Sequence, residues 1–159
     1  LVSPNWIIYR LSDVILMQAE AMVCLAQSVS DPLIASAATN VNAVYRRANN
    51  DLSKDTVVVK SLTSIEEMED IVLNERRREL LFEGKRWYDM VRVCRRRGST
   101  EYVLTNVMPK YQDNREAIRV RLANLDALYA PIAKSELKIN PELKQNPMYK
   151  ENEDISKSK

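Results

Sequence analysis

Several residue types that common catalytic sites need are missing or scarce in this chain. The 159 residues include no histidine, only two glycines and only two cysteines. The lack of histidine excludes Ser-His-Asp and Cys-His catalysis and every His-ligated metal site. Two glycines are too few for a Gly-rich phosphate loop or for a β-sandwich with many tight turns. We therefore expect no metal and no cofactor.

The two cysteines, Cys24 and Cys94, are too few for a disulfide framework. Both fall inside helical patterns, which favours buried free thiols. Their spacing alone leaves a Cys24–Cys94 disulfide open.

Charge and hydropathy argue against two further classes, nucleic-acid-binding proteins and membrane-spanning proteins. The net charge of +2 is too close to balance for a nucleic-acid-binding protein, which usually has a strong basic excess. The longest apolar stretches cover only a few residues, so no segment is expected to span a membrane. No secretion signal or lipid-anchor sequence is present at the start, so such a segment would have to lie in sequence not shown here.

Apolar residues spaced three and four apart predict two helices in the first third of the chain, over residues 11–27 and 32–48. Asp31 and Pro32 mark the start of the second helix, as an N-cap followed by proline at the first helical position. The loop between the two helices is so short that they must lie antiparallel, as a hairpin. Small residues on the facing stripes are typical of tetratricopeptide hairpins, although one hairpin alone is no repeat array.

Two further helices are predicted over residues 64–83 and 85–97. Ser64 and Glu67 fit a capping box at the start of the first of them, and Gly84 is placed to end it in the left-handed conformation. Residues 49–63 are predicted to form a loop with one short extended stretch at 57–59.

The last third of the chain is weakly patterned. Residues 99–119 are predicted to form a loop, followed by a short helical turn at 121–128. Three prolines preclude long helices after residue 130, and residues 151–159 are predicted to be a frayed polar tail. The predicted fold class is all-α: a tetratricopeptide-like helical hairpin plus two further helices and long irregular loops.

Three glutamates form an unusual cluster in the helix predicted over 64–83. At about 100° per residue, Glu75, Glu79 and Glu83 fall in a sector of roughly 80° on its apolar face. A bare buried carboxylate would cost several kcal/mol, so each glutamate needs a cationic partner, and arginine is the best one. The sequence predicts a structural ion-pair network. Its candidate arginines come from other segments: Arg10, Arg46, Arg47, Arg86 and Arg92.

Two functional interpretations of the charged residues, a glycosidase pair and an anion site, are less well supported than a structural role. Glu75 and Glu79 lie roughly 6 Å apart, close to the spacing of a retaining glycosidase pair. However, their face belongs to the core, and nearby arginines would keep both carboxylates ionised, leaving no general acid. Residues 95–97, three consecutive arginines, favour a solvated helix end over an anion site.

Four segments resemble, in order and spacing, the motifs of the SusD/RagB family of outer-membrane nutrient-binding lipoproteins. They are Tyr9-Arg10-Leu11-Ser12-Asp13-Val14-x-Leu16-Met17-x-Ala19-Glu20-Ala21, Asn42-Ala43-Val44-Tyr45-Arg46-Arg47-Ala48, Glu75-Arg76-Arg77-x-Glu79-Leu80-x-Phe82-Glu83-Gly84-x-Arg86-Trp87-x-Asp89-x-x-Arg92, and Asn140-Pro141-x-Leu143-Lys144-Gln145-Asn146-Pro147-x-Tyr149. The chain departs from the family pattern at Tyr45, at Ala133, where the family usually has proline, and at Met148, where it usually has glycine.

The resemblance implies that residues 1–150 are the C-terminal domain of a larger surface lipoprotein of the outer membrane. The lipid-anchored cysteine and most tetratricopeptide helices would precede this sequence. It also implies a SusC-like TonB-dependent transporter as partner, oligosaccharides or in some members peptides as ligands, and no enzyme activity. Ligand contacts vary within the family, so none is carried over by motif.

Sugar rings stack on exposed aromatic side chains, which gives candidate binding residues from chemistry alone. Tyr102 and Tyr111 lie in the long predicted loop, where function tends to concentrate, and Trp6 precedes the first helix. Trp87 lies in an apolar stripe and is interpreted as structural. Polar neighbours in the same loop are Asn106, Gln112, Asp113 and Asn114. The main alternative function is a helical protein–protein interaction scaffold with no small ligand.

Overall fold

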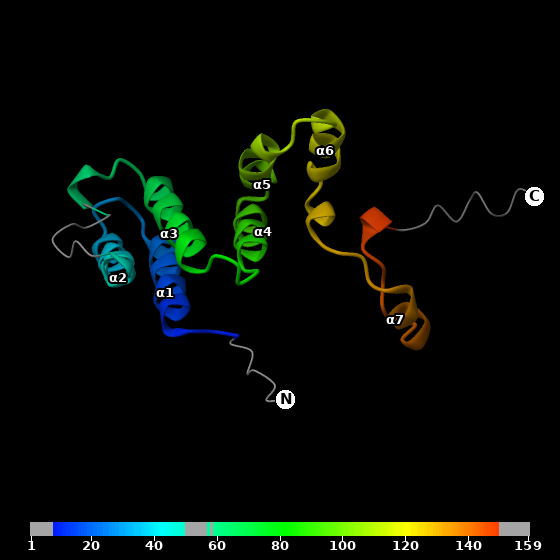
Figure 1. Cartoon of the computed structure of the whole chain (residues 1–159), viewed down its shortest axis with the longest axis horizontal. Helices are drawn as coiled ribbons and strands as arrows, with labels where there is room; N and C mark the ends of the chain where they lie inside the picture. Colours follow the sequence, from blue (N-terminus) through cyan, green and yellow to red (C-terminus); the bar gives the residue numbers. More distant parts are fainter. Residues whose placement is uncertain (1–7, 50–56, 58, 150–159) are drawn as a thin grey trace, which may run out of the picture. The chain divides into compact units, whose positions relative to one another are not determined.

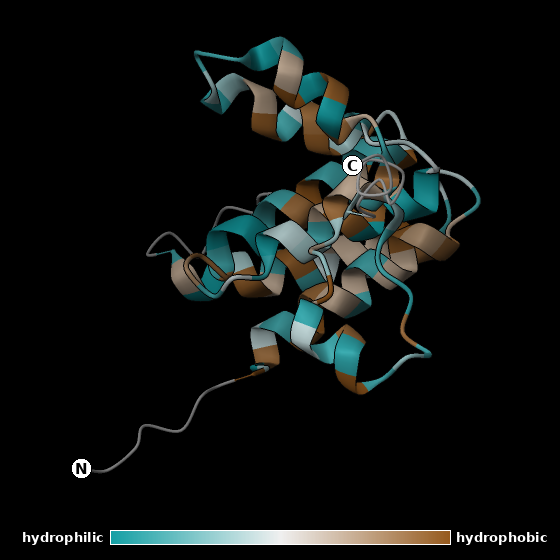
Figure 2. Cartoon of the chain, turned by 90° about the vertical axis from the view of Figure 1, so that its right-hand side faces the viewer, coloured by the Kyte–Doolittle hydropathy of each residue, from teal (hydrophilic) through white to brown (hydrophobic). Residues whose placement is uncertain are grey.

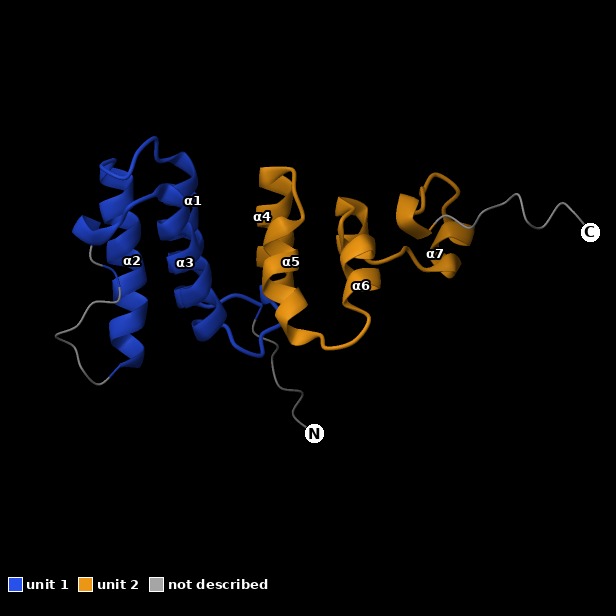
Figure 3. Ribbon diagram, turned by 90° about the horizontal axis from the view of Figure 1, so that it is seen from above, with its two compact units in different colours: residues 1–86 blue, residues 87–159 orange. Residues whose placement is uncertain are grey.

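The computed structural model describes residues 8–49, 57 and 59–149. Within these residues the chain forms seven α-helices, four short 3-10 segments and no strand, which confirms the all-α prediction (Figure 1). Figure 2 shows that the helices carry hydrophobic as well as hydrophilic residues. The chain divides into two compact units, residues 1–86 and 87–159 (Figure 3).

Three helices that contact one another form the first unit: α1 (Leu11–Leu25), α2 (Pro32–Ala48) and α3 (Ile65–Glu79). The predicted hairpin is confirmed, with α1 two residues shorter than expected. Asp31 caps α2, because its carboxylate accepts a hydrogen bond from the Leu33 amide at 2.9 Å. The core between these helices is built from aliphatic and small side chains: Leu16, Ala19, Val23, Ile34, Ala37, Ala38, Val41, Val44, Met68 and Val72.

The helix α3 ends four residues earlier than predicted, and the reason is tertiary. Arg10 donates a hydrogen bond to the carbonyl oxygen of Glu79, which a continuing helix would use to accept from the amide of Glu83. The Glu83 amide bonds to Leu80 instead, at 3.1 Å. The chain then turns through two left-handed residues, Phe82 at φ 66° and Gly84 at φ 73°.

At the start of α3 the predicted cap forms with one difference. The Ser64 hydroxyl accepts from the Glu67 amide at 3.0 Å, as a capping box requires. The Glu67 carboxylate reaches one residue further back than expected, where it accepts from both the amide and the hydroxyl of Thr63 at 2.8 Å.

A side-chain amide in α2 holds the one described residue of the segment before η1 (Val59–Ser61). Asn42 donates from Nδ2 to the Val57 carbonyl oxygen and accepts from the Val57 amide, both at 3.0 Å and both buried. This pair of bonds imitates a strand partner and places Val57 in the core, where it is 4% exposed. The predicted extended stretch at 57–59 is wrong for its last residue, because Val59 begins a 3-10 helix.

The second unit contains shorter helices than the first: α4 (Arg86–Arg97), α5 (Glu101–Val107), α6 (Arg115–Leu122) and α7 (Lys134–Ile139). The prediction of a loop over 99–119 is wrong, since α5 fills much of it and α6 begins in it. Each of these two helices covers only about two turns, too few for a clear 3.6-residue period. Their apolar side chains complete a small core with α4. Its buried members are Met90, Val91, Cys94, Val103 and Leu128.

The remaining connections of the second unit are η2 (Met108–Lys110), η3 (Leu125–Leu128) and η4 (Pro147–Tyr149).

The prediction that both cysteines are buried is right for one of them. Cys94 is buried, whereas Cys24 is exposed on α1, and both thiols are free.

Candidate functional site

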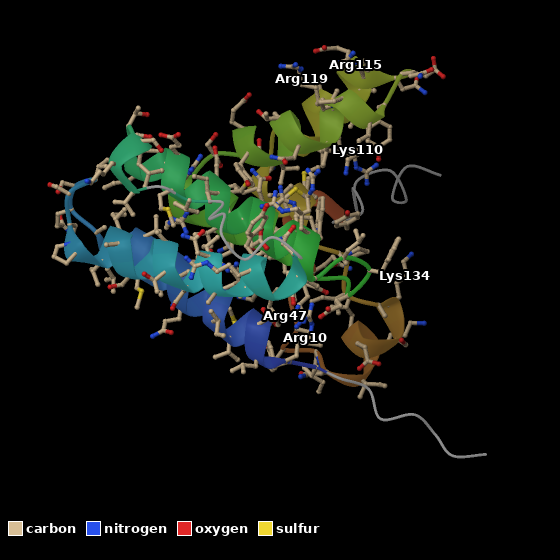
Figure 4. The ribbon with its side chains drawn as sticks, turned by 60° about the vertical axis from the view of Figure 1, so that its left-hand side comes forward. Arg10, Arg47, Lys110, Arg115, Arg119 and Lys134 are labelled. Carbon is tan, nitrogen blue, oxygen red and sulfur yellow. The ribbon has the colours of Figure 1, made fainter. Side chains whose placement is uncertain are left out.

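The charged residues predicted from the sequence meet at the end of α3. Arg10 forms ion pairs with Glu79 and, at 2.8 Å from Nε to Oε1, with Glu83. Arg47, from the last turn of α2, donates to the same Glu79 oxygen at 2.6 Å. Figure 4 shows Arg10 and Arg47 near the start of α1 and the end of α2, respectively. One carboxylate therefore joins all three helices of the first unit.

These contacts shift the acid–base properties of both partners. Burial alone would raise the pKa of the Glu79 carboxyl, but hydrogen bonds from Arg10 and Ser12 and the charge of Arg47 outweigh it and lower the pKa. Burial alone would lower the pKa of Arg10, and the two glutamates outweigh it and raise the pKa. Both groups are therefore charged at neutral pH.

A second, deeper ion-pair set was not singled out from the sequence. Arg76, only 3% exposed, donates to the carboxylate of Asp13 at 2.9 Å, and its Nε lies 4.0 Å from Glu20. Lys85 also binds Asp13, which is fully buried. Burial alone would raise the pKa of Asp13, but Lys85 and Arg76 lower it. The signal was available, because Asp13 and Glu20 stand seven residues apart, which places them on one helix face.

The other predicted network residues are engaged differently. Among the described residues, Glu75 pairs with Arg78 of its own helix, at 3.0 Å from Nε, rather than with an arginine of another segment. Arg86 donates to the carbonyl oxygen of Leu73 at 3.3 Å. Arg92 donates to Asp89 at 2.9 Å, one turn before it in α4.

The surroundings of Glu75 and Glu79 argue against the glycosidase alternative. The side chains of Glu75 and Glu79 are only 4% and 6% exposed, so neither offers a sugar an open carboxylate. The lowered pKa of Glu79 also makes it a poor general acid.

A pocket of about 270 Å³ lies between the start of α1 and the end of α2. Aliphatic side chains form most of its wall, with two arginines at its edge, and it has no aromatic ring. It is lined by Arg10, Leu11, Ser12, Ile15, Ala43, Val44 and Arg47.

The three aromatic candidates have different surroundings. Trp6 lies outside the described residues. Tyr102 packs against the core of the second unit, and the guanidinium of Arg97 lies 5.6 Å from its ring centre. Tyr111 is 46% exposed, just after η2, and Trp87 donates from its indole nitrogen to the carbonyl oxygen of Leu128 at 3.1 Å.

The polar neighbours of the tyrosines also separate into two groups. Asn106 donates to the carbonyl oxygen of Tyr102 at 2.8 Å, within α5. Gln112, Asp113 and Asn114 are exposed in the turn between η2 and α6. Tyr111 is thus the predicted stacking residue whose ring and polar neighbours are accessible in the described structure.

Comparison with known proteins identifies the family. The family model of the SusD family matches residues 2–149. The chain belongs to the SusD family. SusD-like protein P38 of Formosa agariphila is 36% identical over 90 residues, which are 55% of this chain and 17% of that protein. The matched segment thus spans about a sixth of that SusD-like relative, and no solved structure matches the chain.

Among the residues that resemble the family pattern, Arg10, Arg47 and Arg76 supply the charge pairs that join α1, α2 and α3. No described helix combines the length and apolar character that crossing a bilayer requires. Among the described residues, no group of three or more Cys, Asp or Glu side chains is arranged to hold a metal ion.

Proposed function

We propose that this SusD-family chain takes part in nutrient capture at the outer-membrane surface, as a non-catalytic part of a glycan-binding lipoprotein. The bound oligosaccharide, or less often a peptide, passes to a SusC-like TonB-dependent transporter. The observation that carries this proposal is the family match over residues 2–149. The charged cluster supports it indirectly, because its carboxylates serve the scaffold and leave binding to other surfaces.

Within the described residues, Tyr111 is the best candidate for a sugar-stacking contact. Its ring is half exposed, and its neighbours Gln112, Asp113 and Asn114 supply hydrogen-bonding groups for hydroxyls. One open aromatic ring supplies little binding energy. We therefore expect the isolated chain to bind oligosaccharides with a Kd of about 1 mM or weaker, roughly −4 kcal/mol.

Calorimetry against a panel of plant and host glycans tests the proposal. Tyr111→Ala should abolish the residual binding, whereas Tyr88→Ala, which removes another exposed tyrosine of the same unit, should leave it intact. Micromolar binding that survives both Tyr102→Ala and Tyr111→Ala would place the site elsewhere. Release of reducing sugar by the parent but not by Glu79→Gln would overturn the non-catalytic assignment.

One observation favours the alternative, a helical interaction scaffold. The helix α1 exposes several apolar side chains: Leu11, Val14, Met17 and Leu25. Co-expression with the SusC-like transporter separates the two functions. We would conclude that the chain is a scaffold if three results are obtained together. The parent co-purifies with a protein partner, the Val14→Ser/Leu25→Ser variant no longer does, and the parent binds no glycan.

A further inference from the structure

Positive charge is unevenly divided between the two units. Residues 87–149 contain eleven Lys and Arg against seven Asp and Glu, whereas the described residues of the first unit contain nine against ten. The basic excess of the described chain therefore lies in the second unit, the one that carries Tyr111. This distribution favours an anionic ligand there.

Most arginines of that unit are already engaged by the fold. Arg92 pairs with Asp89, and three others lie over tyrosine rings at 5.6 to 5.9 Å. Those three are Arg95 over Tyr129, Arg97 over Tyr102 and Arg121 over Tyr149.

Three basic residues of the second unit are not engaged in this way, and we call them the cationic edge: Lys110, Arg115 and Arg119. All three are exposed, and none of them has a hydrogen bond, ion pair or ring contact with any described residue. Two carboxylates occur in the same segment, Asp113 and Glu116, and neither pairs with the cationic edge among the described residues. The guanidinium forks of the two arginines therefore keep their donors for a ligand.

The local fold brings η2, which carries Lys110, into contact with α6, which carries Arg115 and Arg119. The turn after η2 reverses at Asn114, which has φ 55°, and η2 then contacts α6. At about 100° per residue, Arg115 and Arg119 lie within roughly 60° of Leu122, which packs toward the small core. They therefore border the face of α6 that meets its neighbours, η2 included. Figure 4 shows Arg115 and Arg119 together at the upper side of α6, with Lys110 below them in this view.

We propose that the cationic edge and Tyr111 together bind acidic glycans, whose carboxylate or sulfate groups meet Arg115 and Arg119 while a sugar ring stacks on Tyr111. This inference rests on the proposed glycan-binding function and names its substrate class. Arginine forks bind planar or tetrahedral oxyanions through two parallel hydrogen bonds. Two arginines four residues apart, with Cβ atoms about 6 Å from each other, present two such forks side by side.

Affinity gel electrophoresis of the full chain in matched polysaccharide pairs tests the inference. The probes are polygalacturonate with its fully methyl-esterified form, and a sulfated galactan with its desulfated form. We expect at least tenfold tighter binding to the charged member of at least one pair. Which pair responds distinguishes a carboxylate ligand from a sulfate ligand.

Variants of equal charge change show whether the site is specific. Arg115→Gln/Arg119→Gln should weaken binding to the charged probe at least tenfold. Lys138→Gln/Lys144→Gln removes the same charge from exposed residues of the same unit and should change it less than twofold. A circular dichroism spectrum confirms that each variant is folded.

The outcomes separate this inference from the function on which it rests. Equal binding to charged and neutral members, or equal loss in both variants, would overturn the acidic-glycan inference and leave glycan binding intact. Failure of the folded chain to bind any glycan of the wider panel, neutral or charged, would overturn both.

Discussion

The two units of this chain are held together by different kinds of interaction. In the first unit, carboxylates and arginines from helices far apart in sequence pair inside an apolar core, as Arg76 does with Asp13 and Glu20. In the second unit, short helices surround a small core, and uncharged amides fix the last segment. Motifs of one family thus stabilise consecutive regions of the chain through different interactions: buried ion pairs in the first unit and hydrogen bonds of uncharged amides in the second.

The closing motif of the second unit shows this contrast. Gln145 accepts from the Ile132 amide and donates to the Ile132 carbonyl oxygen, both at 2.9 Å. Asn146 donates to the carbonyl oxygens of Asp126 and Tyr129, at 2.8 and 3.2 Å. These two side chains hydrogen-bond the backbone of residues 126–132, just as Asn42 hydrogen-bonds the backbone of Val57 in the first unit.

The largest expected effect comes from Arg76→Met. This change leaves the buried Asp13 and Glu20 without their arginine, so we expect a loss of about 3–5 kcal/mol in the free energy of unfolding. Urea titration measures the loss, and hydrogen exchange should show it in α1–α3 before α4–α6.

Arg77→Met is the matched control, since Arg77 is the exposed neighbour of Arg76 on α3. It should change the free energy of unfolding by no more than about 0.5 kcal/mol. Equal losses in the two variants would mean that the buried pairs do not stabilise the first unit in particular.

A smaller loss is expected for Glu79→Ala. The arginines it leaves behind, Arg10 and Arg47, have side chains that are 30% and 62% exposed and can turn toward water. We therefore expect a loss of about 2 kcal/mol, the size of a hydrogen bond to a charged group. Asp70→Ala, an exposed change on the same helix, is the control. A melting temperature of Glu79→Ala within a degree or two of the parent's would contradict this role.

Acid should destabilise the first unit preferentially. The folded-state pKa values of Asp13 and Glu79 lie below their ordinary values of about 4. Their contribution to stability is therefore complete above about pH 5 and is lost as the pH falls through the lowered values. NMR amide signals of α1–α3 should change below pH 4 before those of α4–α6. Simultaneous loss of both sets of signals would show that protonation of these carboxylates does not destabilise the first unit in particular.

Removing the amide contact of the second unit should have a local effect. Gln145→Ala deletes its two hydrogen bonds with Ile132 and one from the Asn146 amide, all between uncharged groups and worth about 1 kcal/mol each. Hydrogen exchange at the Ile132 amide should become several-fold faster, with little change in the first unit. Gln112→Ala, which removes an exposed glutamine, should leave that rate unchanged. If Ile132 exchanges equally fast in parent and variant, the contact does not hold the segment.

The smallest perturbation is thiol labelling. Cys24 is exposed on α1 and should react with a thiol reagent within seconds to minutes, whereas buried Cys94 should react only when the second unit opens. In Cys24→Ser, the labelling rate of Cys94 then reports the opening of α4 alone. Equal rates for both thiols in the parent would show that the small core is open in solution.

The sequence predicted features that depend on groups within about one helical turn. Asp31 and Ser64 cap their helices through amides two and three residues ahead, and the stripes of α1 and α2 set the hairpin. The sequence also predicted that glutamates on an apolar face need arginines, because a lone buried charge is too costly. It could not choose among the candidate arginines, since that choice depends on which helices pack together.

The tertiary structure determined the features that depend on residues far apart in the sequence. Arg10 takes the Glu79 carbonyl oxygen across 69 positions and so ends α3 early. The short helices α5 and α6 follow from packing against α4, because about two turns carry too little periodicity and too little helix propensity of their own. The exposure of Tyr111 and the partial burial of Tyr102 likewise depend on that packing. Local hydrogen bonds and periodicity are properties of a segment, whereas burial and long-range charge pairing belong to the folded unit.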